Sequence, residues 1–452
     1  MPISAARTIA FAALLRVETE GAYASDVLHA RLNPKVSPRD AALATEIVMG
    51  ALRWQRLLDF FIERYTRKKL AALDSEVLIA LRIGIYQLRH LARVPANAAV
   101  NDSVEMVKRA RKNSAASLVN AVLRRAARES AKPAEEFLPL DLPPADALGL
   151  LHSHPTWLVE RWLERFGRAE TITILATNNE TPRRACAVIS REFREDVTRS
   201  LVDADVEFEP GRLLREAITI RSGDVTKTKA FEKGWISFQD EASQIIPLLL
   251  DVNPGDSVLD VCAAPGGKTL ALARAAGPKA LVVAADRREN RLRVMRERLA
   301  RAGASNVKFV ALDGTAPLPF SSKFDRILVD APCSGTGTLA RNPEIRWKLK
   351  PTDLAELHAR QVMLLDSALE CLAPKGRLVY STCSLEPEEN EAVVSEASQS
   401  HPEFQMIAPE IPAGALANGI RAEMLLTQDG TFRTFPPLHF TDGFFAAVLR
   451  RR

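Results

Sequence analysis

The sequence predicts a multidomain chain: an all-α bundle, a small α+β segment and an α/β domain. Three observations lead to this fold class. Apolar residues recur at helical spacing and glycine is sparse in residues 1–130. Proline and acidic residues gather in residues 131–149, which is typical of a linker. Short β-rich runs alternate with helical segments from residue 236 onward. The length of 452 residues also exceeds what one hydrophobic core ordinarily supports.

Residues 1–130 are expected to form a compact helical bundle. Leu81 and Ile85 belong to an apolar series at helical spacing. Ser37 followed by Pro38 predicts the start of a helix, because serine caps free N–H groups and proline suits the first helical position.

The middle of the chain predicts a linker over residues 131–149 and a small α+β segment over residues 150–235. A helix is expected at residues 154–166, and short strands are expected at residues 185–190 and 217–221.

Residues 236–452 are expected to form one α/β domain. The alternation of strands and helices predicts a doubly wound, mainly parallel sheet, to which residues 444–449 add a late buried strand. The expected strands are residues 257–261, 281–285, 307–311, 324–329 and 378–381, and the clearest expected helices are residues 288–302 and 353–372.

Composition excludes several classes of protein. Apolar residues make up 47% and charged residues 26% of the chain, as in soluble globular proteins. No stretch approaches the roughly 20 apolar residues of a membrane helix, and Arg16, Glu18 and Glu20 argue against a signal peptide. The five cysteines include no Cys-x-x-Cys pair, which favours reduced thiols, the cytoplasm and no zinc. His152 and His154 have no evident third metal ligand and are expected at the surface or as cap residues.

A glycine-rich turn follows the first expected strand of the α/β domain. It reads Asp-Val-Cys-Ala-Ala-Pro-Gly-Gly-Lys-Thr over residues 260–269 and opens a helix. Glycine lets the backbone approach a ligand closely, and a helix start presents free N–H groups. The Gly-Lys-Thr ending is not a nucleotide triphosphate loop, because Cys262 stands where that motif needs glycine.

Two aspartates end the next two expected strands. Asp286 follows the glycines at the spacing of a carboxylate that binds ribose hydroxyls, and Asp313 is placed to contact an adenine amino group. Either aspartate alone is also explained as a helix cap or turn residue. Together they suit an adenosine cofactor such as S-adenosylmethionine or NAD, and the absence of a Gly-x-Gly-x-x-Gly pattern disfavours NAD.

Two cysteines lie at the ends of neighbouring expected strands. Cys333 follows the fourth strand beside Asp330, and Cys383 ends the fifth, whereas Cys186 and Cys371 fit apolar packing positions. A thiolate that adds to carbon 6 of cytosine makes carbon 5 able to accept a methyl group. Asp330 is then the candidate contact to the cytosine ring nitrogen. These residues alone do not decide which thiol attacks.

The motifs resemble those of the NOL1/NOP2/sun family of RNA (cytosine-5)-methyltransferases. The resemblance implies S-adenosyl-L-methionine as cofactor, Cys383 as nucleophile and Cys333 as the group that assists product release. Its cofactor-binding residues would be Cys262, Ala263, Ala264, Pro265, Gly266, Gly267, Lys268, Asp286, Asp313 and Asp330. The matching motifs are residues 238–243, 262–269, 330–337, 341–343, 382–384 with 389–390, and 442–445.

The N-terminal region resembles a NusB-type RNA-binding domain through residues 46–53 and 119–125. This fusion resembles the RsmB-like branch of the family, which implies one cytosine of 16S, small-subunit, ribosomal RNA as substrate. A monomer is expected. Methylation of transfer RNA and a non-catalytic assembly role are the alternatives. A basic cluster is the candidate RNA contact, although a solvated helix face explains it equally well: Lys108, Arg109, Arg111, Lys112, Arg124 and Arg125.

Overall fold

The computed structural model describes residues 3–32 and 35–452, and the chain divides into two compact units. The first unit comprises residues 1–181 together with 339–351, and the second comprises 182–338 together with 352–452. No helix in the described part of the chain is long and apolar enough to span a bilayer.

The described part of the first unit is helical, as the sequence predicts. α3 begins as expected, because the Ser37 side chain accepts a hydrogen bond from the Asp40 N–H and Pro38 is the first helical residue. The helices are α1 (Ala5–Glu20), α2 (Ala24–Arg31), α3 (Pro38–Arg53), α4 (Gln55–Thr66), α5 (Ser75–His90), α6 (Ala96–Arg109), α7 (Ala116–Glu129), α8 (Pro144–Leu151), α9 (Thr156–Thr177) and α15 (Ile345–Lys348).

Helix α5 runs through the core of this unit. Its residues from Val77 to Gln87 are buried, so it is covered on all sides by other helices. The charged Arg82 is among them, and its guanidinium lies 2.7 Å from an Asp59 oxygen and 2.8 Å from a Glu18 oxygen. Two carboxylates on one guanidinium offset the cost of taking the charge out of water.

Residues 339–351 belong to the helical unit although the chain on either side belongs to the other unit. Arg346 of α15 is fully buried, and its guanidinium donates to the carbonyl oxygens of Arg53, Ser153 and Asn178 at 3.0–3.2 Å. Burial lowers the pKa of Arg346 to about 9. The guanidinium therefore joins α3, the α8–α9 turn and the end of α9 through backbone oxygens.

The structure corrects the expectation for His154, which is a core residue and not a surface or cap residue. Its side chain is fully buried, and its ring packs edge-to-face against Trp162. Its ring nitrogens lie 2.7 Å from the His152 carbonyl oxygen and 3.3 Å from the Asn178 amide nitrogen. Burial lowers the pKa of His154 and so favours a neutral ring. The two polar neighbours satisfy the hydrogen-bonding capacity of its nitrogens.

The second unit begins with a small antiparallel sheet in the order β2-β3-β1-β4. Its strands are β1 (Arg184–Val188), β2 (Glu207–Pro210), β3 (Ile218–Ser222) and β4 (Ile236–Phe238), and its helices are α10 (Arg194–Val202) and α11 (Lys229–Glu232). Cys186 is buried in the core of this sheet, as expected, and burial raises the pKa of its thiol to about 12. The chain leaves β4 and enters α12 (Glu241–Ile245) after two residues.

The larger sheet confirms the predicted doubly wound α/β fold. Five central strands run parallel, and β12 pairs antiparallel with β9. The path order is β10-β12-β9-β8-β5-β6-β7, with β11 paired to β12. The strands are β5 (Val258–Asp260), β6 (Val282–Asp286), β7 (Val307–Ala311), β8 (Phe324–Asp330), β9 (Leu372–Thr382), β10 (Phe404–Ile407), β11 (Phe432–Thr434) and β12 (Phe444–Arg451).

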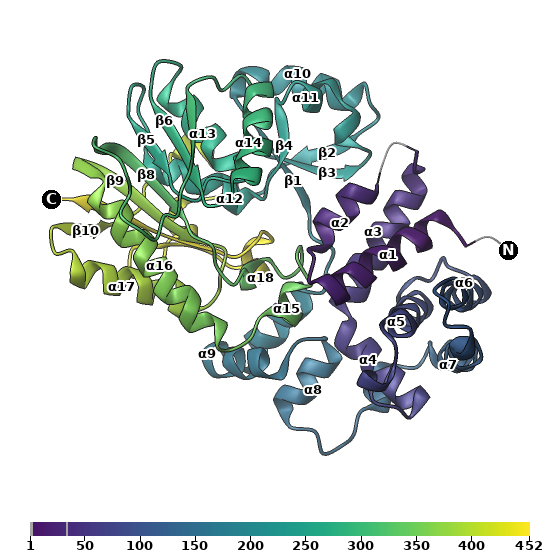
Figure 1. The fold of residues 1–452 in the computed structure, drawn as a ribbon. Helices are drawn as coiled ribbons and strands as arrows, with labels where there is room; N and C mark the ends of the chain where they lie inside the picture. The colour runs from purple at the N-terminus through teal and green to yellow at the C-terminus, as the bar shows by residue number, and fades with distance from the viewer. Residues whose placement is uncertain (1–2, 33–34) are drawn as a thin grey trace. The chain divides into compact units, whose positions relative to one another are not determined.

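Apolar layers cover both faces of this sheet. α13 and α14 pack against β5, β6 and β7, whereas α16 packs against β8 and β9 and α17 packs against β10 (Figure 1). Alternate strand residues enter the two layers, as in β8, where Leu328 belongs to one core and Ile327 and Val329 belong to the other. The helices are α13 (Gly267–Ala276), α14 (Glu289–Arg301), α16 (Asp353–Glu370), α17 (Glu391–Ser400) and α18 (Pro436–His439).

Asp260 ends β5 inside this core. One carboxylate oxygen accepts a hydrogen bond from the Thr269 hydroxyl of α13 at 2.6 Å, and the other oxygen has no partner. Burial raises the pKa of Asp260 to about 7. Because the folded pKa lies above the unfolded value, the protonated acid stabilises the fold below about pH 4 and this stability is lost as pH rises through about 7.

We expect Asp260→Asn to remove this pH dependence. The asparagine oxygen keeps the bond from Thr269, while its N–H₂ lacks an acceptor at every pH. The wild type should lose up to about 4 kcal/mol relative to the variant between pH 4 and pH 8. Thermal unfolding midpoints across this range test it, with the exposed Asp203→Asn as the control. Parallel curves for the wild type and Asp260→Asn would contradict the assignment.

Candidate active site

The carboxyl ends of the parallel strands gather the predicted residues at one edge of the larger sheet. The chain runs from β5 outward through β6 to β7 and then returns to β8 on the other side of β5. The direction of winding therefore changes between β5 and β8, which is where open α/β sheets bind ligands. Asp260 and Asp330 end these two strands.

The predicted cofactor loop, residues 262–268, connects β5 to α13. Gly266 has φ +98°, in the region that favours glycine, and it directly precedes the first residue of α13. A side chain at Gly267 would meet the Gln239 amide at 3.0 Å, so the absence of a Cβ lets the loop approach the segment after β4. Cys262 is half-buried in the loop, and burial raises the pKa of its thiol.

Asp286 ends β6 and faces the same loop. Its carboxylate accepts hydrogen bonds from the backbone N–H groups of Arg288 at 2.9 Å and Ala264 at 3.3 Å. The Arg291 guanidinium of α14 lies 3.3 Å from the same carboxylate. The two backbone bonds orient the acid at the position that the sequence predicts for a ribose contact.

Asp313, which follows β7, is more exposed. It accepts hydrogen bonds from the Thr315 N–H at 3.1 Å and the Thr315 hydroxyl at 2.7 Å, and these bonds lower its pKa. The Arg287 guanidinium lies 3.4 Å away. Asp313 therefore acts as a turn residue in this structure. Its other carboxylate oxygen faces the Arg287 guanidinium at the sheet edge.

Asp330 and Lys268 form the central ion pair. The Lys268 ammonium donates to one Asp330 oxygen at 2.8 Å, and the Ser381 hydroxyl donates to the other at 2.8 Å. Lys268 also lies 5.2 Å from the centre of the Phe444 ring. The pair therefore joins the cofactor loop, the end of β8 and the end of β9.

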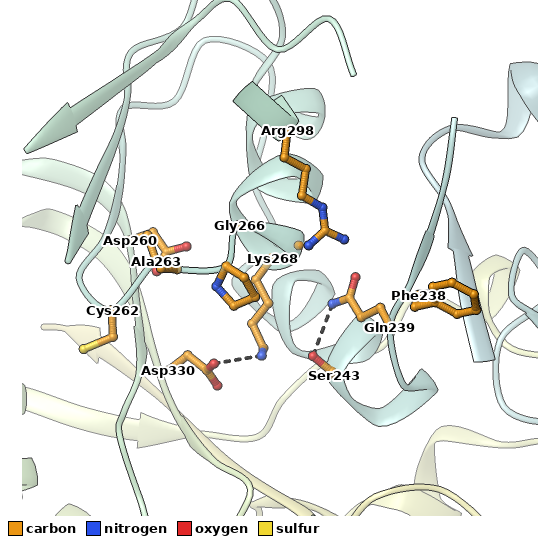
Figure 2. A pocket seen from close by; sticks show the side chains of 13 residues that line it. Phe238, Gln239, Ser243, Asp260, Cys262, Ala263, Gly266, Lys268, Arg298 and Asp330 are labelled. Carbon is orange, nitrogen blue, oxygen red and sulfur yellow. Dashed lines mark hydrogen bonds and ion pairs between the residues drawn. The ribbon is translucent and has the colours of Figure 1, made fainter. Parts of the chain in front are cut away.

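A pocket opens beside this ion pair. Figure 2 shows Asp260, Cys262 and Asp330 along one wall, with Gln239, Ser243 and Arg298 along the other. The Gln239 amide donates to the Ser243 hydroxyl at 3.2 Å. Sequence reasoning named Gln239 and Ser243 only as parts of a motif, and it missed Arg298, whose position on a basic helix gives no signal of a pocket.

The two predicted catalytic cysteines lie side by side. Their sulfur atoms are 3.4 Å apart, and both residues are half-buried free thiols. The contact with Cys383 is the largest cause that raises the pKa of Cys333, and burial and the carboxylate of Glu389 act in the same direction. By contrast, Cys371 lies buried in the apolar core, as predicted.

The loop that carries Cys333 is held against the end of β9. The Gly337 N–H donates to the Cys383 carbonyl oxygen at 2.9 Å, and the Gly337 carbonyl oxygen accepts from Gly443 at 2.8 Å. A Cβ at Gly337 would meet the Gly443 oxygen at 2.2 Å. Glycine is therefore required for this close approach of the two backbones.

The basic cluster of the helical unit is partly neutralised. Arg111 and Arg124 are exposed, and the Arg124 guanidinium donates to Asn120 at 3.1 Å. Four other members lie near acids of the same unit: Lys108 and Arg109 near Glu105 at 3.7 and 3.8 Å, Lys112 near Asp74 at 3.1 Å, and Arg125 near Glu129 at 3.4 Å. These acids weaken the positive electrostatic field of the cluster, which is therefore smaller than its formal charge indicates.

Comparisons with known proteins match each part of the chain. Residues 247–450 match the family model described as 16S rRNA methyltransferase RsmB/F, residues 4–128 match the NusB family, and residues 154–226 match the RsmF/B-like ferredoxin-like domain.

Full-length relatives share this arrangement. The probable ribosomal RNA small subunit methyltransferase B of Synechocystis is 32% identical over 99% of both chains. The ribosomal RNA small subunit methyltransferase B of Yersinia pestis is 34% identical over 88% of this chain and 91% of its own. The crystal structure of PH0851 covers 100% of this chain and 99% of its own, with a TM-score of 0.81 and 26% identity. The chain therefore belongs to the RsmB/F family of 16S ribosomal RNA methyltransferases, which are S-adenosylmethionine-dependent and form 5-methylcytosine.

Proposed function

We propose that this chain methylates carbon 5 of one cytosine in 16S ribosomal RNA through a covalent bond between Cys383 and carbon 6. The observation that carries the proposal is the pair of thiols 3.4 Å apart at the ends of β8 and β9. They follow the two strands whose ends carry Asp330 and Ser381, and Asp330 is paired with Lys268. A nucleophile, a second thiol and a charged hydrogen-bonding pair are the groups that this reaction requires.

Cys383 is the proposed nucleophile. The family motif Thr382-Cys383 favours it, and the raised pKa of Cys333 supports it, because Cys333 then keeps its proton and donates toward Cys383. Cys383 thiolate adds to carbon 6, and the ring electrons move toward carbon 5 and the ring nitrogen. After methyl transfer, a base takes the carbon 5 proton, the electron pair of that C–H bond restores the double bond between carbons 5 and 6, and the bond between carbon 6 and sulfur breaks, so that Cys383 leaves as a thiolate. The protonated Cys333 assists this release by donating a hydrogen bond to the leaving sulfur. Free thiols of this kind suit the cytoplasm.

Asp330 and Lys268 are proposed to contact the cytosine ring. An ionised carboxylate only accepts hydrogen bonds, whereas the ring nitrogen that gains electron density needs a donor. The Lys268 ammonium, 2.8 Å from Asp330, supplies that proton and positive charge. We therefore assign the ring contact to the pair and not to Asp330 alone.

The residues at the sheet edge fit S-adenosylmethionine. Residues 262–268 and Asp330 would lie against it, while the Asp286 carboxylate accepts hydrogen bonds from ribose hydroxyls and Asp313 lies at the adenine end. The residues are suitable, because the buried Asp286 carboxylate, held by backbone N–H groups, matches hydroxyl donors, and the more exposed Asp313 carboxylate matches an amino donor. When bound, the cofactor supplies an electrophilic methyl group.

Asp286→Ala should weaken S-adenosylmethionine binding. Loss of the carboxylate leaves ribose hydroxyls without acceptors, at a cost of roughly 1–3 kcal/mol. Isothermal calorimetry on the folded variant measures this, with Asp203→Ala as a control outside the sheet edge. Equal affinities for the wild type and Asp286→Ala would remove Asp286 from the cofactor site.

The two cysteine variants should differ in whether they retain a covalent adduct. Cys383→Ala should be inactive and form no adduct, because it lacks the attacking sulfur. Cys333→Ala should attack normally but release slowly, so a protein–RNA species should survive denaturing gel electrophoresis. An adduct trapped in Cys383→Ala would reverse the roles. Full methylation by both variants without any adduct would rule out the covalent mechanism.

The helical unit is proposed to bind the RNA backbone. Phosphate contacts depend on positive charge and carry little sequence information, so base choice would come from the sheet edge, which must receive an unstacked cytosine. Arg111 and Arg124 are the members of the basic cluster best suited to this role, because the ion pairs with acids described above involve its other members.

Arg111→Gln combined with Arg124→Gln should weaken RNA binding by the full chain. Each lost phosphate contact should reduce the slope of log affinity against log salt by about 0.7–0.9. Arg39→Gln combined with Lys68→Gln removes the same charge at exposed positions outside the cluster. If both double variants lose the same slope, net charge and not the cluster governs binding.

A further inference from the structure

A buried carboxylate connects the two cysteine loops. Glu389 ends the short helical turn Pro387–Glu389 before α17, and its side chain is fully buried. One oxygen accepts from the Ser334 N–H at 2.7 Å and from the Gln361 amide at 3.0 Å. The other oxygen accepts from the hydroxyls of Ser334 and Ser384. Four neutral donors therefore hold this anion inside the unit.

These donors adjoin the reactive residues. Ser334 follows Cys333, and Ser384 follows Cys383, so a single carboxylate oxygen joins the positions directly after both thiols. The two serine oxygens are 3.0 Å apart, close to the 3.4 Å separation of the sulfur atoms. Loss of the hydrogen bonds between Glu389 and these two serines must therefore change the position of one cysteine relative to the other.

The side-chain amides of Asn390 and Gln361 also form hydrogen bonds with the segments that carry the two cysteines. Asn390 accepts from the Thr382 hydroxyl at 2.5 Å and donates to the Ser384 carbonyl oxygen at 2.9 Å, so it grips the chain on both sides of Cys383. Gln361 of α16 donates to the Pro332 carbonyl oxygen at 2.9 Å, directly before Cys333. Glu389 lies at the centre of this network, because it bonds to both loops and to Gln361.

We propose that Glu389 is a positioning residue that holds the two thiols at their working separation and places a negative charge beside Cys333. The proposal rests on the two-cysteine reaction described above. It gives Glu389 no contact with RNA or cofactor. Its function is to fix the loops through Ser334 and Ser384.

The charge of Glu389 has its own consequence. The titratable groups that interact with Cys333 include Cys383 directly after β9, Tyr380 of β9 and Glu389 itself, while α16 contributes the neutral Gln361. Contact with Cys383 and burial raise the pKa of the Cys333 thiol most, and the Glu389 carboxylate adds to the same shift. Glu389 therefore helps to keep Cys333 protonated while Cys383 attacks, so that the second thiol does not compete as a nucleophile.

The test compares Glu389→Gln with Glu391→Gln in the full chain. Glutamine keeps the length of the side chain and removes the charge, and Glu391 is a more exposed acid two residues away that pairs with Arg433. Alkylation of each cysteine by iodoacetamide, followed by peptide mass spectrometry across pH, reports the protonation of each thiol. Methyl transfer kinetics report the positioning.

For Glu389→Gln we expect the pH midpoint of Cys333 alkylation to fall. We also expect kcat to drop by about 10²-fold with unchanged KM for RNA, because a displacement of about 1 Å costs about this much. Glu391→Gln should match the wild type in both measurements. The proposal is overturned if Glu389→Gln leaves both the Cys333 midpoint and kcat at the values of Glu391→Gln.

Two further variants keep the test decisive if Glu389→Gln does not fold. Ser334→Ala and Ser384→Ala each remove one hydroxyl donor and leave the carboxylate in place, and each should lower kcat without weakening cofactor binding. Normal kcat in both would also overturn the proposal. Alkylation does not depend on methylation, so an inactive wild type would refute the proposed function while the shift at Cys333 is still measured.

Discussion

The parallel pairing of β8 with β9 is the constraint on which the site depends. Asp330 lies opposite Ser381 in this register, and the Ala331 N–H donates to the Ser381 carbonyl oxygen at 2.8 Å. After each of these two strands, only a few residues are needed to bring a cysteine to the carboxyl end of the sheet. A shift by one residue would turn Asp330 and Ser381 to opposite faces and separate the two loops. The burial of β8 and β9 on both faces opposes such a shift.

Carboxylates crowd the same edge, and the fold offsets their repulsion in different ways. Asp330 is paired with Lys268, and Asp286 is held by backbone N–H groups and Arg291. Asp260, which is fully buried with one hydrogen bond, is only partly ionised at neutral pH because burial raises its pKa to about 7. The edge therefore carries less negative charge at neutral pH than its sequence indicates.

Much of this fold follows from sequence because its elements have strong local patterns. The strands alternate with helices, and the motif residues follow strand ends, so parallel topology alone brings Asp286, Asp330 and Cys383 to one edge. The sequence does not show that residues 339–351 pack with the N-terminal helices, because that packing depends on a buried Arg346 whose partners are backbone oxygens far away in the chain. The core position of His154 is hidden for a different reason, because a polar residue beside a second histidine gives no local signal that its ring packs against Trp162.

Glu389 illustrates a different limit of sequence reasoning. It was visible as part of a motif with Asn390, but a carboxylate in a polar stretch predicts an exposed helix start. Only the tertiary structure reveals its burial and its four donors. The basic cluster shows the converse, because Lys112 is close to Asp74 in space but far from it in sequence. Charge read along the chain therefore overstates the field that RNA would meet.

Three partners fix the buried Asp286 carboxylate in place. Two of its hydrogen bonds come from backbone N–H groups, which cannot move without breaking the loop or the start of α14. The third partner is the Arg291 guanidinium, whose side chain is 47% exposed. The pair is half-buried, because the Asp286 side chain is only 6% exposed, and the Arg291 guanidinium also donates to the Ala264 carbonyl oxygen at 2.8 Å, so Arg291 links the acid to the loop after β5. Under the proposed function, a ribose hydroxyl would compete with this guanidinium at an acceptor whose orientation the backbone N–H groups already set.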